Sequence, residues 1–105
     1  MKGFEVIFMA PRSRRHDGTP VLDAIVDIAR EHDITRMTRR VNAEGTGAGG
    51  HCHSAHFFEL ADEPEELMFV LDGGDADALI RAVEAKEMHV FCLRRQIDYW
   101  QFGDD

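Results

Sequence analysis

The sequence predicts an α+β protein, a ferredoxin-like β-α-β-β-α-β sandwich in which both helices cover one face of a sheet. Three observations carry this prediction. Residues 4–10 and 67–71 are runs of strand length that lack a helical period. Two segments that begin near residues 19 and 73 instead repeat apolar residues at helical spacing. The 105 residues, 44% of them hydrophobic, are enough for one domain, 1–105, with its own core.

The first part of the chain predicts a strand, a helix and a second strand. After the strand at 4–10, a basic loop leads to a helix start, with Thr19 as the N-cap and Pro20 in the first helical position. The helix should end near residues 32–33. Residues 34–41 contain several β-branched side chains and therefore favour the second strand.

The middle of the chain begins with a Gly-rich loop at about 42–54. A short strand is expected at 55–60, and an acidic turn at 61–66 follows it. The continuous apolar run 67–71 predicts a central strand that is covered on both faces.

The last part of the chain predicts a second helix, a final strand and a tail. The helix opens at residues 73–75, with Asp75 as its N-cap. Residues 89–93 are expected to form the last core strand, in which Cys92 is inert packing. An aromatic C-terminal tail, 97–105, closes the chain.

Charge limits the partners that the protein can have. The net charge is −8, from 12 Lys and Arg against 20 Asp and Glu, which argues against nucleic-acid binding because phosphate backbones need a basic surface. Eight of the 12 basic residues are arginines in three clusters, at 12–15, 36–40 and 94–95. If folding brings these together, they form a basin for a small anion. The alternative is that they pair with surface carboxylates.

The sequence also indicates a compartment. No apolar run approaches the roughly 18 residues that a membrane span needs, so we expect no membrane insertion. Residues 1–5 lack the apolar core of a signal peptide. The two cysteines, Cys52 and Cys92, are too few for a disulfide framework. We therefore expect a soluble, cytoplasmic protein.

The expected strands carry apolar side chains on both of their faces, whereas two helices can cover only one face of the sheet. Residues 4–10 and 67–71 both have this composition. Another apolar surface should cover the second face, and a further copy of the same chain is the simplest candidate. The sequence thus predicts a closed homo-oligomer.

Several motifs occur in order between about residues 4 and 95. They are His16-x-Gly18-x-Pro20, Asp23-Ala24-Ile25-Val26, Gly45-x-Gly47, His53-Ser54-Ala55 and Glu59-Leu60-Ala61-Asp62-Glu63-Pro64. With these motifs the chain resembles a PII-like family long labelled as a domain of unknown function. That family is similar to the nitrogen-regulatory PII signal proteins and, more distantly, to the CutA proteins.

The resemblance implies a homotrimer of ferredoxin-like subunits that binds a small effector, often an adenine nucleotide, in clefts between subunits. It also implies that the loop after the second strand reports the bound state to a partner, commonly a membrane transporter. Two departures stand out. The chain's one tyrosine, Tyr99, lies in the tail, so the loop has none to be uridylylated. Residues 86–88 take the place of the glycine-rich phosphate loop of the nitrogen-regulatory proteins, which argues against ATP binding of their kind.

The stretch 44–56, EGTGAGGHCHSAH, has three interpretations. In the first it is an anion cradle, because glycines let backbone N–H groups point inward and converging arginines supply forked donors. No lysine of the P-loop kind follows, so a P-loop enzyme is excluded. The predicted ligand-binding residues are Gly45, Gly47, Gly49, Gly50, Arg39, Arg40, Arg94 and Arg95.

In the second interpretation the stretch is a metal site. His51, Cys52, His53 and His56 are suitable ligands for zinc, copper or nickel. In an extended chain, however, His51 and His53 point one way while Cys52 and His56 point the other. One strand would then supply two ligands to an ion, and the remaining ligands would have to come from elsewhere.

In the third interpretation the glycines form a mobile loop and the histidines are polar residues at the start of a strand, which is compatible with the first interpretation. A purely structural oligomer without a ligand is a separate possibility. Catalysis is not expected, because Cys52 and His53 face opposite sides of an extended chain and no third residue orients them. We therefore predict a regulator that binds a small anionic effector such as AMP, ADP or ATP. The alternatives are a metal-binding or metal-sensing protein that takes a divalent metal, and a structural oligomer.

Overall fold

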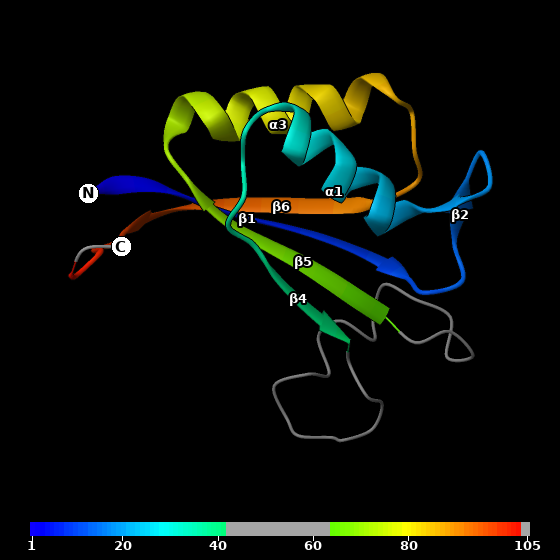
Figure 1. Ribbon diagram of the computed structural model, residues 1–105, viewed down its shortest axis with the longest axis horizontal. Helices are drawn as coiled ribbons and strands as arrows, with labels where there is room; N and C mark the ends of the chain where they lie inside the picture. The colour runs from blue at the N-terminus through cyan, green and yellow to red at the C-terminus, as the bar shows by residue number, and fades with distance from the viewer. Residues whose placement is uncertain (42–63, 104–105) are drawn as a thin grey trace.

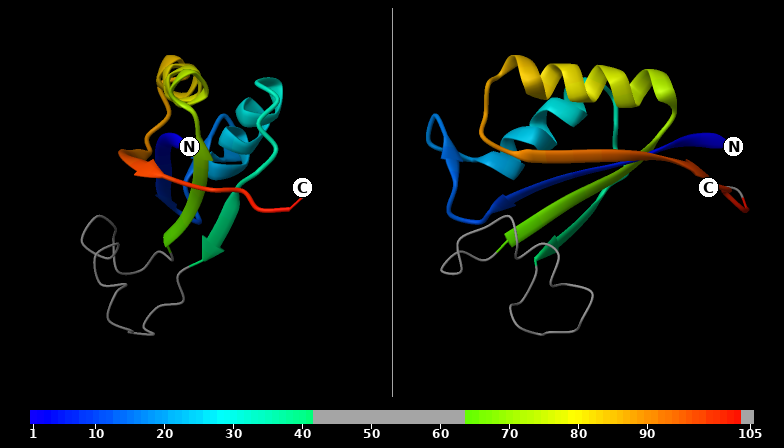
Figure 2. Two further views of the ribbon diagram at one scale, coloured as in Figure 1. Left: turned by 90° about the vertical axis from the view of Figure 1, so that its left-hand side faces the viewer. Right: turned by 180° about the vertical axis from the view of Figure 1, so that it is seen from behind.

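The computed structural model describes residues 1–41 and 64–103. Figure 1 shows the long strands as one sheet, and both views of Figure 2 show the two helices together on one face of it. The strand order is β4-β5-β1-β6 with antiparallel neighbours, the ferredoxin-like arrangement that the sequence predicts. The elements in chain order are β1 (Lys2–Pro11), β2 (Arg15–His16), β3 (Thr19–Pro20), α1 (Val21–Glu31), β4 (Thr38–Val41), β5 (Pro64–Leu71), α3 (Gly73–Ala85) and β6 (Phe91–Asp98).

The register of the two central strands defines the core. Directly paired residues point to the same face of a sheet. Val6 of β1 pairs with Phe69 of β5, and Phe8 pairs with Leu67. All four side chains are at most 1% exposed, because apolar residues of α1 and α3 pack over them. The rings of Phe8 and Phe69 meet edge to face with their centroids 6.0 Å apart.

The first helix begins later than predicted. Thr19 is not its N-cap but pairs with His16 in a short hairpin, β2–β3, of which residues 15–18 were expected to be a loop. Asp17 and Gly18 form the turn with φ of 52° and 83°, the backbone that a two-residue hairpin favours. Pro20 therefore occupies the N-cap position, without a side-chain hydrogen bond. The predicted end near residues 32–33 is confirmed, since α1 ends at Glu31.

Asp72, and not Asp75, caps α3. The Asp72 side chain accepts a hydrogen bond of 2.8 Å from the Asp75 backbone N–H. The prediction of Asp75 as the cap was wrong because Gly73 and Gly74, which have the composition of a turn, are the first two helical residues. The Asp75 carboxylate instead lies in the first turn, near the positive end of the helix dipole.

The second strand is shorter than predicted. β4 begins at Thr38 rather than at residue 34. Asp33 has a φ of 61°, and the Ile34 N–H donates to the Ala29 carbonyl at 2.9 Å, so this segment closes the C-terminal end of α1. Ile34 is consequently 7% exposed as part of the core and not as part of the sheet.

The strands β1, β5 and β6 are longer than predicted, and the short strand expected at 55–60 lies outside the described residues. β5 begins at Pro64, so Glu65 and Glu66 belong to the sheet and not to an acidic turn. The last strand spans Phe91–Asp98 instead of 89–93, because its pairing with β1 continues to Lys2, the first residue of β1. The first residues of the predicted tail, 97–105, are therefore still part of β6.

The second face of the sheet is also apolar, as predicted. Ile7 pairs with Met68 on one side and with Leu93 on the other, so an apolar row crosses three strands. No helix of the described residues covers this face (Figure 2). β5 is thus an interior strand, but helices of the described chain cover only one of its faces. We call this second face the open face; its apolar residues are Ile7, Met9, Met68, Val70, Phe91, Leu93 and Ile97.

The segment after β6 crosses one end of the open face. The Tyr99 N–H donates to the Met1 carbonyl at 2.8 Å, and the Met1 amino group donates back to the Tyr99 carbonyl at 2.7 Å. Trp100 and Phe102 are 68% and 82% exposed. Neither α1 nor α3 has the length and the hydropathy that crossing a bilayer would require.

Candidate functional site

Arg39, one of the predicted ligand-binding residues, joins three elements near the end of β4. Its Nη1 donates to Oδ1 of Asp23 on α1 at 2.7 Å, and its Nη2 donates to Oε1 of Glu65 on β5 at 3.1 Å. Partial burial lowers the pKa of Arg39, but its hydrogen bonds to Asp23 and Glu65 and their negative charges raise that pKa by more. The guanidinium is therefore always charged, and two carboxylates hold it in place.

Glu65 is buried although it carries a charge. Its exposure is 8%, since it lies in phase with Leu67 and Phe69 on the helix-facing side of β5. Oε1 lies 3.1 Å from Arg39, and Oε2 lies 3.3 Å from Nε of Arg12, which follows β1. A buried carboxylate needs such partners because burial removes its hydration. We call Arg12, Asp23, Arg39 and Glu65 the Glu65 cluster.

Arg40 and Arg95 lie on the open face, at opposite edges of the sheet. Arg40 on β4 pairs with Glu66 at 3.8 Å. Arg95 on β6 donates through Nε to Glu5 of β1 at 2.6 Å. The two ion pairs flank the apolar row that contains Ile7, so the open face has paired charges beside its apolar centre.

Arg94 lies on the helix-facing side of β6. Its Nη1 donates to Asp77 of α3 at 2.6 Å. The centre of its guanidinium also lies 4.7 Å from the centroid of the Phe4 ring, a cation–π geometry. Arg94 therefore holds α3 against the edge of the sheet.

The four predicted arginines do not converge within one chain. β4 and β6 are the two edges of the sheet, with β5 and β1 between them. Three strand spacings separate the edges by about 14 Å. Consecutive residues of a strand also point to opposite faces, so Arg39 and Arg94 are on the helix side while Arg40 and Arg95 are on the open face. Each of the four pairs with a carboxylate.

The other predicted site residues lie outside the described residues. These are the glycines of the cradle, Gly45, Gly47, Gly49 and Gly50, and the four metal ligands, His51, Cys52, His53 and His56. Within 1–41 and 64–103, no three His, Cys, Asp or Glu side chains are grouped so that they could hold a metal ion.

The carboxylates that hold the arginines of this site were not predicted from the sequence. Glu65 and Asp23 hold Arg39, and neither was a candidate. One signal could have found Glu65: it continues the alternation of Leu67 and Phe69 toward the N-terminus of β5, and a charged residue in an inward-facing phase requires an oppositely charged partner.

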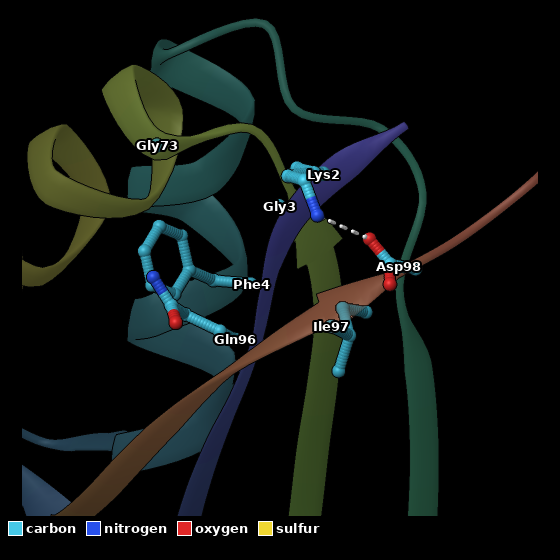
Figure 3. Close-up of a pocket in the computed structure, with 7 residues that line it drawn as sticks. All are labelled: Lys2, Gly3, Phe4, Gly73, Gln96, Ile97 and Asp98. Atoms are coloured by element: carbon cyan, nitrogen blue, oxygen red, sulfur yellow. Dashed lines mark hydrogen bonds and ion pairs between the residues drawn. The ribbon is translucent and has the colours of Figure 1, made fainter.

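Two hollows lie elsewhere on the described surface. The first, of about 350 Å³, lies between the beginning of α3 and the end of β6 (Figure 3). Lys2 and Asp98 both line it and form an ion pair, with Nζ 3.2 Å from Oδ1. The second, of about 840 Å³, lies on the open face between β4, β5 and the C-terminal segment that contains Trp100. Neither hollow was predicted from the sequence.

Cys92 is half-buried against the core, as the predicted inert packing requires. Burial raises the pKa of its thiol to about 11, although the charge of Arg94 acts in the opposite direction. The thiol is therefore protonated at neutral pH, and a protonated thiol is a poor nucleophile.

Comparisons with known proteins agree with this fold. Residues 6–92 match the family DUF190, described as "Uncharacterized ACR". No curated protein matches the chain. One similar solved structure is CPII from Thiomonas intermedia K12 bound to ADP, AMP and acetate, with a TM-score of 0.67 and 10% identity over 95% of this chain and 90% of that one.

A second structure is CPII from the same organism, described as a nitrogen regulatory PII-like protein bound to ADP, AMP and bicarbonate. Its TM-score is 0.59 at 12% identity, over 92% of this chain and 87% of that one. The family match covers most of the chain, and the neighbours share its ferredoxin-like fold. The chain therefore belongs to the DUF190 family and is similar in fold to PII-like proteins.

Proposed function

We propose that the protein is a PII-like regulator that binds a small anionic effector, an adenine nucleotide such as AMP, ADP or ATP, between the subunits of a homotrimer. It would act in the cytoplasm and pass the bound state to a partner such as a membrane transporter. The observation that carries this proposal is the likeness of fold, over 95% of the chain, to a PII-like protein that holds ADP and AMP.

Arginines at the two edges of the sheet support an effector site between subunits. β4 and β6 are edge strands, and each carries two of the predicted arginines. In a ring of copies, the β4 edge of one subunit would face the β6 edge of the next. Arg39 and Arg40 would then approach Arg94 and Arg95 of the neighbouring copy, which one chain alone does not achieve. Forked guanidinium groups suit phosphate oxygens, and Gly45, Gly47, Gly49 and Gly50 are the proposed backbone donors.

The open face supports the homotrimer. Its central row, Met68, Ile7 and Leu93, is apolar. The charged residues beside this row, Arg40 with Glu66 and Arg95 with Glu5, pair with each other within the face, so burying the row would leave these four charges paired. An apolar surface with internally paired charges suits contact with further copies of the same chain.

A regulatory role requires no reaction at this site, and we propose none. The PII-like neighbour is described as regulatory. Cys92, the thiol within the described residues, is protonated at neutral pH because burial raises its pKa to about 11.

Calorimetric titration of the full-length protein with AMP, ADP and ATP tests the effector. We expect at least one nucleotide to bind, and Arg39→Ala and Arg95→Ala each to weaken that binding at least tenfold. Arg30→Ala is the matched control, because Arg30 is a 72% exposed arginine whose ion pair, with Asp27, lies within α1; this variant should bind like the wild type. No heat from any nucleotide at millimolar concentration would contradict the proposal, as would a monomer in sedimentation at micromolar concentration.

A further inference from the structure

The Glu65 cluster is built like an anion site that is already occupied. Two guanidinium groups approach one carboxylate. Nη2 of Arg39 lies 3.1 Å from Oε1 of Glu65, and Nε of Arg12 lies 3.3 Å from Oε2. Each oxygen of Glu65 therefore meets a different arginine, as the oxygens of a phosphate or of a free carboxylate do when two arginines hold it.

The arginines reach this carboxylate from the solvent side. The Glu65 side chain is 10% exposed, whereas the Arg12 and Arg39 side chains are 55% and 34% exposed. An anion that arrives from solution can thus contact both guanidinium groups without entering the core. Glu65 must turn aside for such an anion to take its position.

Charge balance keeps the closed cluster unattractive to anions. The positive charges of Arg12 and Arg39 are matched by the negative charges of Glu65 and Asp23, whose Oδ1 lies 2.7 Å from Arg39. Displacing or neutralising Glu65 removes the carboxylate contact that Arg12 and Arg39 share. The same arginines then form a site that attracts phosphate or carboxylate groups.

We infer that Arg12 and Arg39 form an anion clamp that the Glu65 carboxylate keeps closed, so that a ligand bearing a phosphate or carboxylate group binds only by displacing Glu65. The ligand class rests on the proposed function, and the inference adds an autoinhibitory contact to it. The apparent affinity is then the intrinsic affinity multiplied by the fraction of chains in which the clamp is open. A clamp that is open in one chain of a hundred binds about a hundredfold more weakly than a permanently open one.

Glu65→Gln tests the inference, because it removes the charge and retains the shape of the side chain. The probe is inorganic pyrophosphate, titrated calorimetrically into the full-length protein. We expect pyrophosphate to bind Glu65→Gln at least tenfold more tightly than the wild type. The double variant Glu65→Gln/Arg39→Gln should lose this gain, since it removes one arm of the clamp.

Asp98→Asn is the matched control. Asp98 is an exposed carboxylate that pairs with Lys2 at 3.2 Å, at the end of β1 opposite to Arg12, so its replacement changes the net charge equally at a distance from the clamp. We expect pyrophosphate affinity within twofold of the wild type. Equal gains in the two variants would indicate a general charge effect and would overturn the clamp.

A parallel titration with ADP separates this inference from the proposed function. ADP binding by the wild type without any gain in Glu65→Gln would overturn the clamp and leave the proposed function standing. A pyrophosphate gain confined to Glu65→Gln, with no nucleotide bound by any variant, would support the clamp and contradict the proposed effector.

Asp23→Asn provides a second test if Glu65→Gln does not fold. The Asp23 side chain is 46% exposed, so its replacement leaves the core intact. It removes one of the two carboxylates that hold Arg39, and we expect pyrophosphate to bind about threefold more tightly. Unchanged or weaker binding would overturn the clamp.

Discussion

The guanidinium of Arg39 donates a 2.7 Å hydrogen bond to the carboxylate of Asp23 and so joins the edge strand β4 to the first turn of α1. β4 has four residues, all of them exposed, and hydrogen-bonds to one neighbour, β5. The link to α1 is therefore a side-chain contact that holds this short strand against the helix layer.

Asp23→Asn should lower the free energy of unfolding by about 0.5–1 kcal/mol, because it breaks a charge-assisted hydrogen bond between two partly exposed groups. Urea unfolding followed by circular dichroism measures the change. Asp27→Asn is the control: its pair with Arg30 spans 3.7 Å between side chains that are both about 70% exposed, and its loss should have almost no effect. Equal losses from the two variants would contradict a particular role for the Arg39 contact.

Gly3→Ala should destabilise the protein by about 1–3 kcal/mol, the usual cost of overpacking. A Cβ at this position would lie 2.5 Å from the Leu71 carbonyl oxygen and 2.8 Å from Cε1 of Tyr99. Gly74→Ala is the contrasting variant, since its nearest contact is 3.6 Å from an Asp72 oxygen and it lies in the first turn of α3. It should stabilise the protein by up to about 0.5 kcal/mol through helix propensity. Thermal unfolding compares the two, and a neutral Gly3→Ala would contradict the close approach.

Asp72→Ala should cost about 1 kcal/mol, because it removes the cap that accepts the Asp75 N–H. Asp72→Asn retains a capping oxygen and should recover most of the loss. Asp75→Ala loses only a favourable interaction with the helix dipole and should cost less than Asp72→Ala. Denaturant titration of the three variants measures the order, and a reversed order of the two alanine variants would restore Asp75 as the cap.

Cys92 should make stability depend on pH in the alkaline range. Its pKa is raised to about 11 by burial, so the unfolded chain loses the thiol proton at a lower pH than the folded chain does. The contribution to stability is present below about pH 8.5 and is lost as the pH rises toward 11. In the Cys52→Ser variant Cys92 is the remaining thiol. Over this pH window the free energy of unfolding of Cys52→Ser should fall more than that of Cys52→Ser/Cys92→Ala. If the free energies of unfolding of the two variants changed equally with pH, this would contradict the raised pKa of Cys92.

Met68→Lys should convert the proposed trimer into monomers, because it introduces a charge into the central row of the open face. Ala85→Lys introduces the same charge at an exposed position at the end of α3 and should leave the assembly unchanged. Sedimentation velocity measures the mass, and circular dichroism verifies that both variants fold. A full-sized assembly with Met68→Lys would contradict the use of the open face.

The element order could be predicted from the sequence because periodicity is local. Apolar repeats at helical spacing identified α1 and α3, and β-rich runs identified β1 and β5. The first and last residues of the helices and strands were less predictable, because they depend on single hydrogen bonds. The donation from Asp75 to Asp72 decides where α3 begins, and the turn at Asp17 and Gly18 places Thr19 in a hairpin.

The sequence by itself determined the fold class and the apolar character of both sheet faces, since each follows from spacing along one strand or helix. Only the tertiary structure decided where the arginines lie. Arg39 and Arg94 belong to opposite edges because strand order is set by long-range pairing, which leaves no local trace in the chain. It also decided the position of Glu65, whose inward phase is visible in the sequence but whose partners, Arg12 and Arg39, meet it only when three strands assemble.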